Sequence, residues 1–190
     1  VNEALEAFRF NDAALTVYKF IWNEYCDWYI ELTKSKLADP GLKRVAAQNM
    51  LIHVLDSALK LLHPFMPFIT EEIWQKLPQN EDSIMVSAFP EYREAQTNEA
   101  IEKEMAVIME VITGIRNIRG EMNLNPGLKL NVLVKTQNSA IQQTLQYHGE
   151  YVRELARVEQ LETGPKIEKP KVSASSVLGE MDLIIPLEGI

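Results

Sequence analysis

The sequence of 190 residues is poor in the side chains that build catalytic and metal-binding centres. It has one cysteine, Cys26, and three dispersed histidines: His53, His63 and His148. One cysteine forms no internal disulfide, and scattered histidines lack the spacing of zinc ligands. Gly-rich phosphate loops and the Gly-x-Ser-x-Gly and His-Glu-x-x-His motifs are also missing. The sequence therefore predicts no catalytic residue, metal or cofactor in this chain. It also favours a reducing compartment such as the cytoplasm, with Cys26 as a small core residue.

Long hydrophobic runs are missing as well, so no membrane-spanning segment or secretory signal is expected. The net charge of −8 argues against nonspecific binding to nucleic acid. The charges are unevenly distributed, because residues 71–110 carry ten acids and three bases. Residues 33–44, in contrast, hold Lys34, Lys36, Lys43 and Arg44 against Asp39 alone. This basic cluster is either merely solvated or a local contact for RNA phosphates, and the two readings are evenly balanced.

Hydrophobic periodicity predicts long helices through most of the chain. Asn11-Asp12 is a good N-cap for a helix that runs to about Leu37, with Ala14, Tyr18, Ile21, Tyr25, Trp28 and Leu32 on its inner face. After the turn at Asp39-Pro40-Gly41, a second helix covers about Leu42 to Leu62. A third long helix opens at Asn98, and its apolar stripe runs through Ile101, Met105, Ile108, Ile112, Ile115 and Met122.

A double-proline corner, residues 63–74, joins the second helix to a short one. Pro64 should end the upstream helix, and Pro67 suits the first turn of the next. We expect the apolar side chains of this elbow to be buried: Phe65, Phe68, Ile69, Ile73 and Trp74. The segment 79–97 is expected to be a loop, with 83–86 as a short extended piece.

The period changes from helical to alternating after Asn125-Pro126-Gly127. Residues 128–135 predict a strand, and 139–158 a helix. Two more strands are expected at 158–162 and 182–187, with a loop or weak hairpin at 163–176. The predicted fold is mainly α: a helical bundle at 1–97, a long linking helix at 98–125, and a small α/β module at 126–190. Val1 reads as mid-helix, so the chain is expected to be a piece of something larger.

Three segments in order carry a family resemblance. The elbow 63–74 resembles the corner in the anticodon-binding helical domain of the class I synthetases for valine, isoleucine and leucine. Trp22-Asn23-Glu24-Tyr25-Cys26-Asp27-Trp28-Tyr29 and Ile115-Arg116-Asn117-Ile118-Arg119-Gly120-Glu121-Met122-Asn123 narrow the resemblance to the valyl-tRNA synthetase family. The ending Ile185-Pro186-Leu187-Glu188-Gly189 is similar to the segment before that family's C-terminal coiled coil.

The resemblance implies an anticodon-binding bundle, truncated at its N-terminal side, and a junction module that precedes an absent coiled coil. The implied role is to position valine tRNA for ATP-dependent aminoacylation by a catalytic domain outside this chain. ATP would be a cofactor of the parent enzyme, and the implied partners are valine tRNA and the parent's other domains. The His-x-Gly-His and Lys-Met-Ser-Lys-Ser signatures of class I synthetases are absent, so this chain alone should be inactive. The alternatives are the same region of an isoleucyl-tRNA synthetase, whose usual cysteine-rich zinc module has no counterpart here, or a helical interaction scaffold without an RNA role.

The candidate tRNA-binding residues are Lys34, Lys36, Lys43, Arg44, Arg116 and Arg119. Arg119 occupies a position where the stripe predicts an apolar residue. We favour an internal salt bridge, with an acid of helix 12–37 as one partner, over a guanidinium fork aimed at phosphate or at the junction between bundle and module. The aromatic residues between Tyr18 and Tyr29 are expected to be core rather than a surface that stacks bases. His53 and His63 are expected to be solvated.

Overall fold

The computed structural model describes residues 1–78 and 81–189. The chain divides into two units, Val1–Arg93 and Glu94–Ile190. The start of the expected loop 79–97 and the last residue of the expected module 126–190 lie outside the described residues. Among the described residues, no helix is long and apolar enough to cross a membrane.

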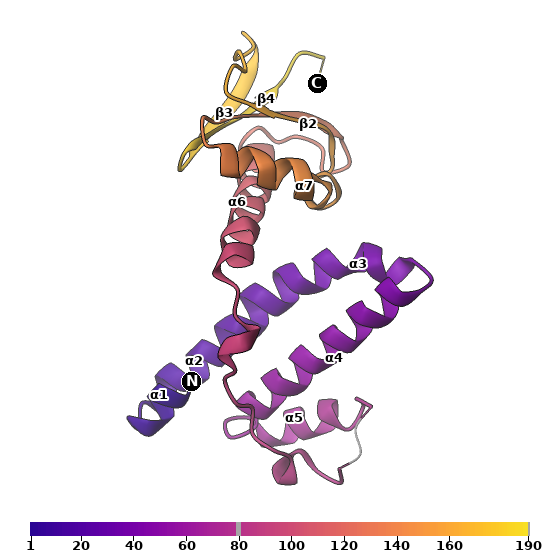
Figure 1. Ribbon diagram of the computed structural model, residues 1–190, viewed down its shortest axis with the longest axis vertical. Coiled ribbons are helices and arrows are strands. Elements are labelled where there is room, and N and C mark those ends of the chain that lie inside the picture. The colour runs from indigo at the N-terminus through magenta and orange to yellow at the C-terminus, as the bar shows by residue number, and fades with distance from the viewer. Residues whose placement is uncertain (79–80, 190) are drawn as a thin grey trace. The chain divides into compact units, whose positions relative to one another are not determined.

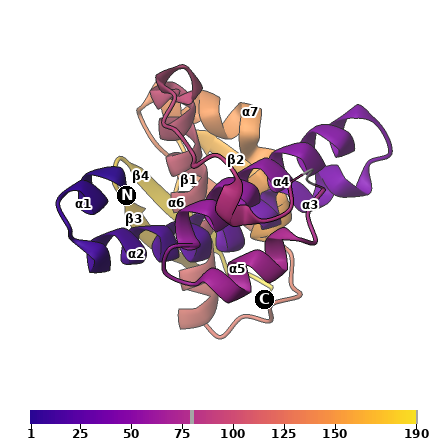
Figure 2. The ribbon, with the colours of Figure 1, turned by 90° about the horizontal axis from the view of Figure 1, so that it is seen from below.

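The first unit is built from helices (Figure 1). They are α1 (Asn2–Glu6), α2 (Phe10–Lys19), the π-helix η1 (Phe20–Ile30), α3 (Glu31–Ala38), α4 (Leu42–Leu62), α5 (Pro67–Trp74) and the 3₁₀ turn η2 (Ile84–Val86). From α2 through η1 to α3 the chain winds without a break, and α4 then runs back beside α3, as Figures 1 and 2 both show. Gly41 allows this reversal, because its φ of 141° lies in a region that other residues avoid. The predicted helix 42–62 is confirmed.

The first long helix differs from its prediction in two respects. It begins at Phe10 after an N-cap at Arg9, so Asn11-Asp12 is not the cap. Residues 20–30 have the wider i→i+5 winding of a π-helix. The buried residues are Ala13, Val17, Tyr25 and Thr33, spaced in steps of four and eight. The expected inner face is wrong at Tyr18, which is 58% exposed although it lies in α2, before the π-helix begins.

The elbow forms where the prolines predict it. α4 ends at Leu62, and Pro67 is the first residue of α5. A small core of Leu59, Trp74 and Ile84, with Leu55 and Leu77 beside it, fastens α5 and η2 to α4. Trp74 is buried as expected, but Phe68, Ile69 and Ile73 are exposed, because a single helix of eight residues turns only one face to α4. The expected extended piece at 83–86 is also wrong, since Ile84–Val86 forms the turn η2.

The second unit packs two helices against a sheet (Figure 1). After the 3₁₀ turn η3 (Glu94–Gln96) come α6 (Glu99–Glu121), β1 (Leu130–Lys135), α7 (Ser139–Leu155), β2 (Val158–Gly164), β3 (Ser173–Leu178) and β4 (Met181–Pro186). Asn98 caps α6 as predicted, accepting hydrogen bonds from the amides of Ala100 and Ile101. Asn138 caps α7 in the same way.

The strand order is β2-β1-β4-β3. β1 and β2 are parallel, with α7 as the crossover, while β4 pairs antiparallel with β1 and β3. Both helices contact the sheet and each other. α6 approaches the sheet closely at Gly114, where a Cβ would lie 2.7 Å from Leu178 Cδ1 and 2.8 Å from Leu183 Cδ2. Glycine at this position therefore permits the contact between helix and sheet.

The sequence prediction holds for most of this unit. Leu130, Val132 and Val134 of β1 are buried, as are Ile108, Ile112 and Ile115 of α6. The stripe of α6 is wrong at its ends, because Ile101 is 56% and Met122 is 46% exposed. The segment 163–176, expected as a loop or weak hairpin, leads into the regular strand β3, which pairs with β4 as a hairpin. The predicted class, mainly α with a helical part followed by a small α/β part, is confirmed.

Candidate nucleic-acid interface

Four of the candidate residues gather where α3 turns into α4. We call this group, Lys34, Lys36, Lys43 and Arg44, the basic corner; all four side chains are exposed. Lys34 forms a 2.6 Å ion pair between Nζ and Glu31 Oε1. Within the described residues, Lys43 and Arg44 make no hydrogen bond or ion pair through their side chains. Gly41, the N-cap of α4, has no side chain to accept from the first amides of that helix. The corner therefore combines cationic side chains with the positive end of a helix dipole.

Arg116 and Arg119 lie in the other unit, on α6, and donate hydrogen bonds to backbone carbonyls of that unit. Arg116 Nη2 donates to Leu155 O at 3.2 Å. Arg119 donates from Nη1 to Asn125 O at 3.3 Å, and from Nη2 to three further carbonyls. Those three are Leu128 O at 2.8 Å, Ala156 O at 2.9 Å and Arg157 O at 3.0 Å. Burial lowers the pKa of Arg119 from its usual value, and the charge of Arg157 lowers it further.

The expected salt bridge of Arg119 is therefore wrong, because within the described residues its partners are carbonyl oxygens. The physical reason lies at the end of α7, whose last carbonyls have no partner within the helix. A guanidinium offers five N–H donors in a fixed fork and can satisfy several such oxygens at once. Arg119 thus fastens α6 to the start of β1 and the end of α7.

The aromatic residues of α2 and η1 are divided between core and surface. Tyr25 is buried as expected, and its hydroxyl donates to Leu51 O at 3.0 Å. Tyr18 and Trp22 were expected to be core as well, but they are 58% and 56% exposed. Their rings are nearly parallel, with an interplanar angle of 4° and centroids 6.4 Å apart. The structure therefore leaves a flat, exposed aromatic pair on this helix.

The elbow contains polar contacts that the sequence did not indicate. The indole Nε1 of Trp74 donates to Asp56 Oδ1 at 2.6 Å, and Lys60 Nζ lies 3.0 Å from Asp56 Oδ2. Lys60 Nζ also lies 5.9 Å from the centroid of the Trp74 ring. A helical spacing of four residues between Asp56 and Lys60 is visible in the sequence, but the indole partner is not. These three residues hold α5 against α4.

Two further contacts close the elbow. His63 Nδ1 and Thr70 Oγ1 are 2.7 Å apart, so the expectation that His63 is simply solvated is wrong. Glu71 accepts hydrogen bonds from Gln75 Nε2 at 2.7 Å, Ser83 Oγ at 2.9 Å and the amide of Ile84 at 3.1 Å. The bond from Gln75 is the largest cause that lowers the pKa of Glu71 below its usual value. Glu71 therefore ties α5 to the segment that follows it, which is a structural role.

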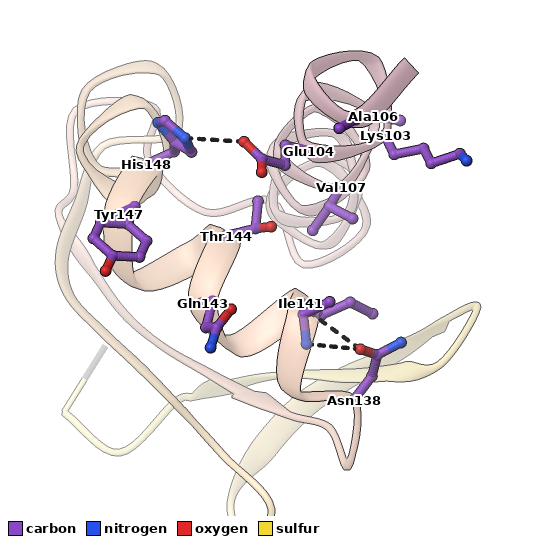
Figure 3. Close-up of a pocket in the computed structure, with 12 residues that line it drawn as sticks. Lys103, Glu104, Ala106, Val107, Asn138, Ile141, Gln143, Thr144, Tyr147 and His148 are labelled. Atoms are coloured by element: carbon purple, nitrogen blue, oxygen red, sulfur yellow. Dashed lines mark hydrogen bonds and ion pairs between the residues drawn. The ribbon is translucent and has the colours of Figure 1, made fainter. Parts of the chain in front are cut away.

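A groove of about 620 Å³ lies between α6 and α7 (Figure 3). His148 Nε2 and Glu104 Oε2 face each other at 3.3 Å, from α7 and α6 respectively. None of the candidate RNA-binding residues lines this groove. In the part of the chain that the structure describes, no group of three or more His, Cys, Asp or Glu could hold a metal ion.

Comparison with known proteins identifies the family. Residues 1–134 match the model of the anticodon-binding domain of tRNA ligases. The chain belongs to this family. This stretch contains the basic corner, the aromatic pair, the elbow, α6 and all of β1 except Lys135.

The curated relatives are similar over the whole chain. A valine–tRNA ligase of Geobacter sulfurreducens is 44% identical over 99% of this chain and 22% of its own length. Those of Syntrophotalea carbinolica and Enterococcus faecalis are 40% and 37% identical, over 100% of this chain and 21% and 22% of their own lengths. The resemblance to valyl-tRNA synthetases is thus confirmed. The chain spans about a fifth of the length of these relatives.

Proposed function

We propose that this chain is the anticodon-binding part of a valine–tRNA ligase. It holds valine tRNA while the rest of the enzyme, outside this chain, uses ATP to aminoacylate it. The observation that carries the proposal is the match of residues 1–134 to the anticodon-binding family, combined with similarity to valine–tRNA ligases over the whole chain. The single cysteine fits a reducing cytoplasm, where translation takes place.

The exposed cations of the basic corner support this proposal. Phosphate contacts position a nucleic acid on a protein. They require cationic side chains that can exchange bound water for a phosphate oxygen. Lys43 and Arg44 are exposed and make no internal ion pair, so an incoming phosphate replaces no protein partner. Lys34 has a partner in Glu31, but an exposed pair of this kind contributes only about 0–1 kcal/mol and is easily exchanged. The acidic stretch 71–110 disfavours phosphate, so the RNA should lie over the corner and not over that segment.

The aromatic pair supplies a second kind of contact. Proteins recognise single-stranded RNA through bases that leave their stack and pack on aromatic side chains. Each stacked base contributes about 1–3 kcal/mol to the binding free energy. Tyr18 and Trp22 present parallel rings to solvent, which is the geometry that such a base needs. Phosphate contacts at the corner and stacking at this pair together account for binding an anticodon loop by a protein with a net charge of −8.

Charge reversal at the corner tests the function in the complete ligase. The double change Lys34→Glu and Arg44→Glu should raise the KM for valine tRNA about tenfold or more, because two phosphate contacts become repulsive. Valine-dependent pyrophosphate exchange, which needs no tRNA, should not change. Lys76→Glu is a matched control, because Lys76 is an exposed lysine of the same unit with a carboxylate partner, Glu72, at 3.0 Å.

A scaffold without an RNA role and a purely structural role of the corner give different results in this experiment. A helical scaffold without an RNA role would leave the KM for tRNA unchanged in both variants. An equal loss of exchange and tRNA charging would mean that the corner acts on folding. Either result would contradict the proposed function.

A further inference from the structure

Three arginines meet at the C-terminal end of α7 in the second unit. Arg116 and Arg119, one turn apart on α6, donate to the consecutive carbonyls of Leu155, Ala156 and Arg157. The third arginine is Arg157 itself, whose guanidinium lies near the turn that Arg119 also holds. A Cβ built on Gly127 of that turn would be 3.9 Å from Arg157 Nη1. The guanidinium groups therefore share one small region of the surface.

The backbone of Arg157 has a conformation that arginine does not favour. Its φ is 51°, in the left-handed region, directly after the C-cap of α7 at Ala156. Glycine is the usual residue there, and an L-residue with a Cβ is strained in this conformation. The strain is sustained because the carbonyl of Arg157 accepts from both Arg119 Nη2 at 3.0 Å and the amide of Leu130 at 3.1 Å. Strained residues of this kind are often found at binding sites.

The charges of this region are also unbalanced. Within the described residues, neither Arg119 nor Arg157 forms an ion pair with a carboxylate. The positive charge of Arg157 lowers the pKa of Arg119, which shows that the two cations repel each other. The side chain of Arg157 is exposed and makes no hydrogen bond within the same residues. Backbone strain and like-charge repulsion both disfavour an arginine here. The negative end of the α7 dipole offsets part of the repulsion, and a bound anion would offset more.

We propose that Arg157 and Arg116 form a phosphate-binding site at the C-terminal end of α7, with Arg119 as the positioning residue that holds the backbone of Arg157. Guanidinium groups suit phosphate because their paired N–H donors match two of its oxygens. The phosphate source is the RNA backbone, and that part of the proposal rests on the proposed function. This site is separate from the basic corner, which belongs to the other unit.

Arg157→Gly is the sharpest variant, because it removes the guanidinium and suits the backbone. Glycine accepts a φ of 51° without strain, so the variant should melt at the same or a higher temperature than the parent chain. Lys166→Gly is the matched control, since Lys166 is an exposed cation in a turn of the same unit, and its loss changes the net charge equally. A loss of binding in Arg157→Gly without a fall in melting temperature cannot then be ascribed to unfolding.

The test has two arms with the complete 190-residue chain. In the first, inorganic phosphate is titrated at constant ionic strength while amide NMR signals are recorded. The signals of Ala156, Arg157 and Leu130 should move in the parent chain and in Lys166→Gly, and should stay in place in Arg157→Gly. In the second, labelled valine tRNA is titrated at several salt concentrations. Arg157→Gly should weaken binding about threefold to tenfold and reduce the slope of log K against log salt by about 1.

The outcomes separate this site from the proposed function. If Arg157→Gly loses the phosphate-induced shifts and also binds tRNA more weakly, the site takes RNA phosphate. If it loses the shifts but binds tRNA as the parent does, the site takes a free anion. If Arg157→Gly and Lys166→Gly behave alike in both arms, the phosphate site is refuted. If charge reversal at the basic corner still weakens tRNA binding in that case, the proposed function stands without it.

Discussion

Replacement of Trp74 by alanine should strongly destabilise the first unit. Trp74 is 1% exposed and packs on Leu59 and Ile84. Truncation of a buried tryptophan to alanine removes its apolar contacts and leaves a cavity, which together cost about 3–5 kcal/mol. Asp56 also loses the indole donor, but it keeps Lys60 at 3.0 Å and remains partly open to water, so this loss adds little. We therefore expect the free energy of unfolding to fall by about 3–5 kcal/mol.

The assay is urea unfolding followed by tryptophan fluorescence. All three tryptophans, Trp22, Trp28 and Trp74, belong to the first unit, so the signal of the remaining two reports that unit alone. Trp22→Ala provides the control, because the same change at a side chain that is 56% exposed should cost less than about 1 kcal/mol. Trp74→Phe should fall between the two, at about 1–2 kcal/mol, because it refills most of the space but lacks the donor to Asp56. A loss below 1 kcal/mol for Trp74→Ala would refute the elbow core.

Two further predictions concern polar contacts. The lowered pKa of Glu71 means that its contribution to stability is present above its ordinary pKa of 4.5 and is lost as the pH falls through the lower folded value. Glu71→Gln should therefore be less stable than the parent at pH 7 in urea unfolding, and the difference should vanish in acid; a difference that persists or grows in acid would contradict the assignment. Arg119→Ala removes a donor from four carbonyls, of which Asn125 O and Arg157 O keep a backbone amide, and should cost the second unit about 2–3 kcal/mol, measured by hydrogen exchange of the β1 amides. Arg119→Lys should recover only part of this, since full recovery would show that the fork geometry is unimportant.

The structure could be predicted from the sequence where neighbouring residues determine the backbone conformation. The prolines at 64 and 67 ended one helix and began the next, and Asn98 marked the start of α6. The alternation of β1 was predictable because alternate residues of that strand are buried. These features depend on neighbouring residues, so periodicity and capping rules describe them well.

The predictions that were wrong have causes that lie far away in the sequence or in the packing of the helices. No motif in the sequence indicates the π-helical winding of residues 20–30. The exposure of Tyr18, which lies before that segment in α2, depends on which face of the helix is covered. The exposure of Phe68 depends on which face of α5 meets α4, which only the packed structure decides. The interpretation of Arg119 failed because two of its four partners are the carbonyls of Ala156 and Arg157, 37 and 38 residues later, which the end of α7 makes available. No feature of the sequence indicated a role for Arg157, because a left-handed backbone conformation at an arginine cannot be predicted from the residue type.

A direct titration of this chain with valine tRNA is the most decisive measurement for RNA binding at the basic corner. At physiological salt we expect a dissociation constant no tighter than roughly 10⁻⁵ M, because four corner cations act within an acidic chain. The double change Lys34→Glu and Arg44→Glu should weaken this binding about tenfold or more, and Lys76→Glu should not. Submicromolar binding, or binding that the reversal of Lys34 and Arg44 leaves unchanged, would contradict a tRNA contact at the corner.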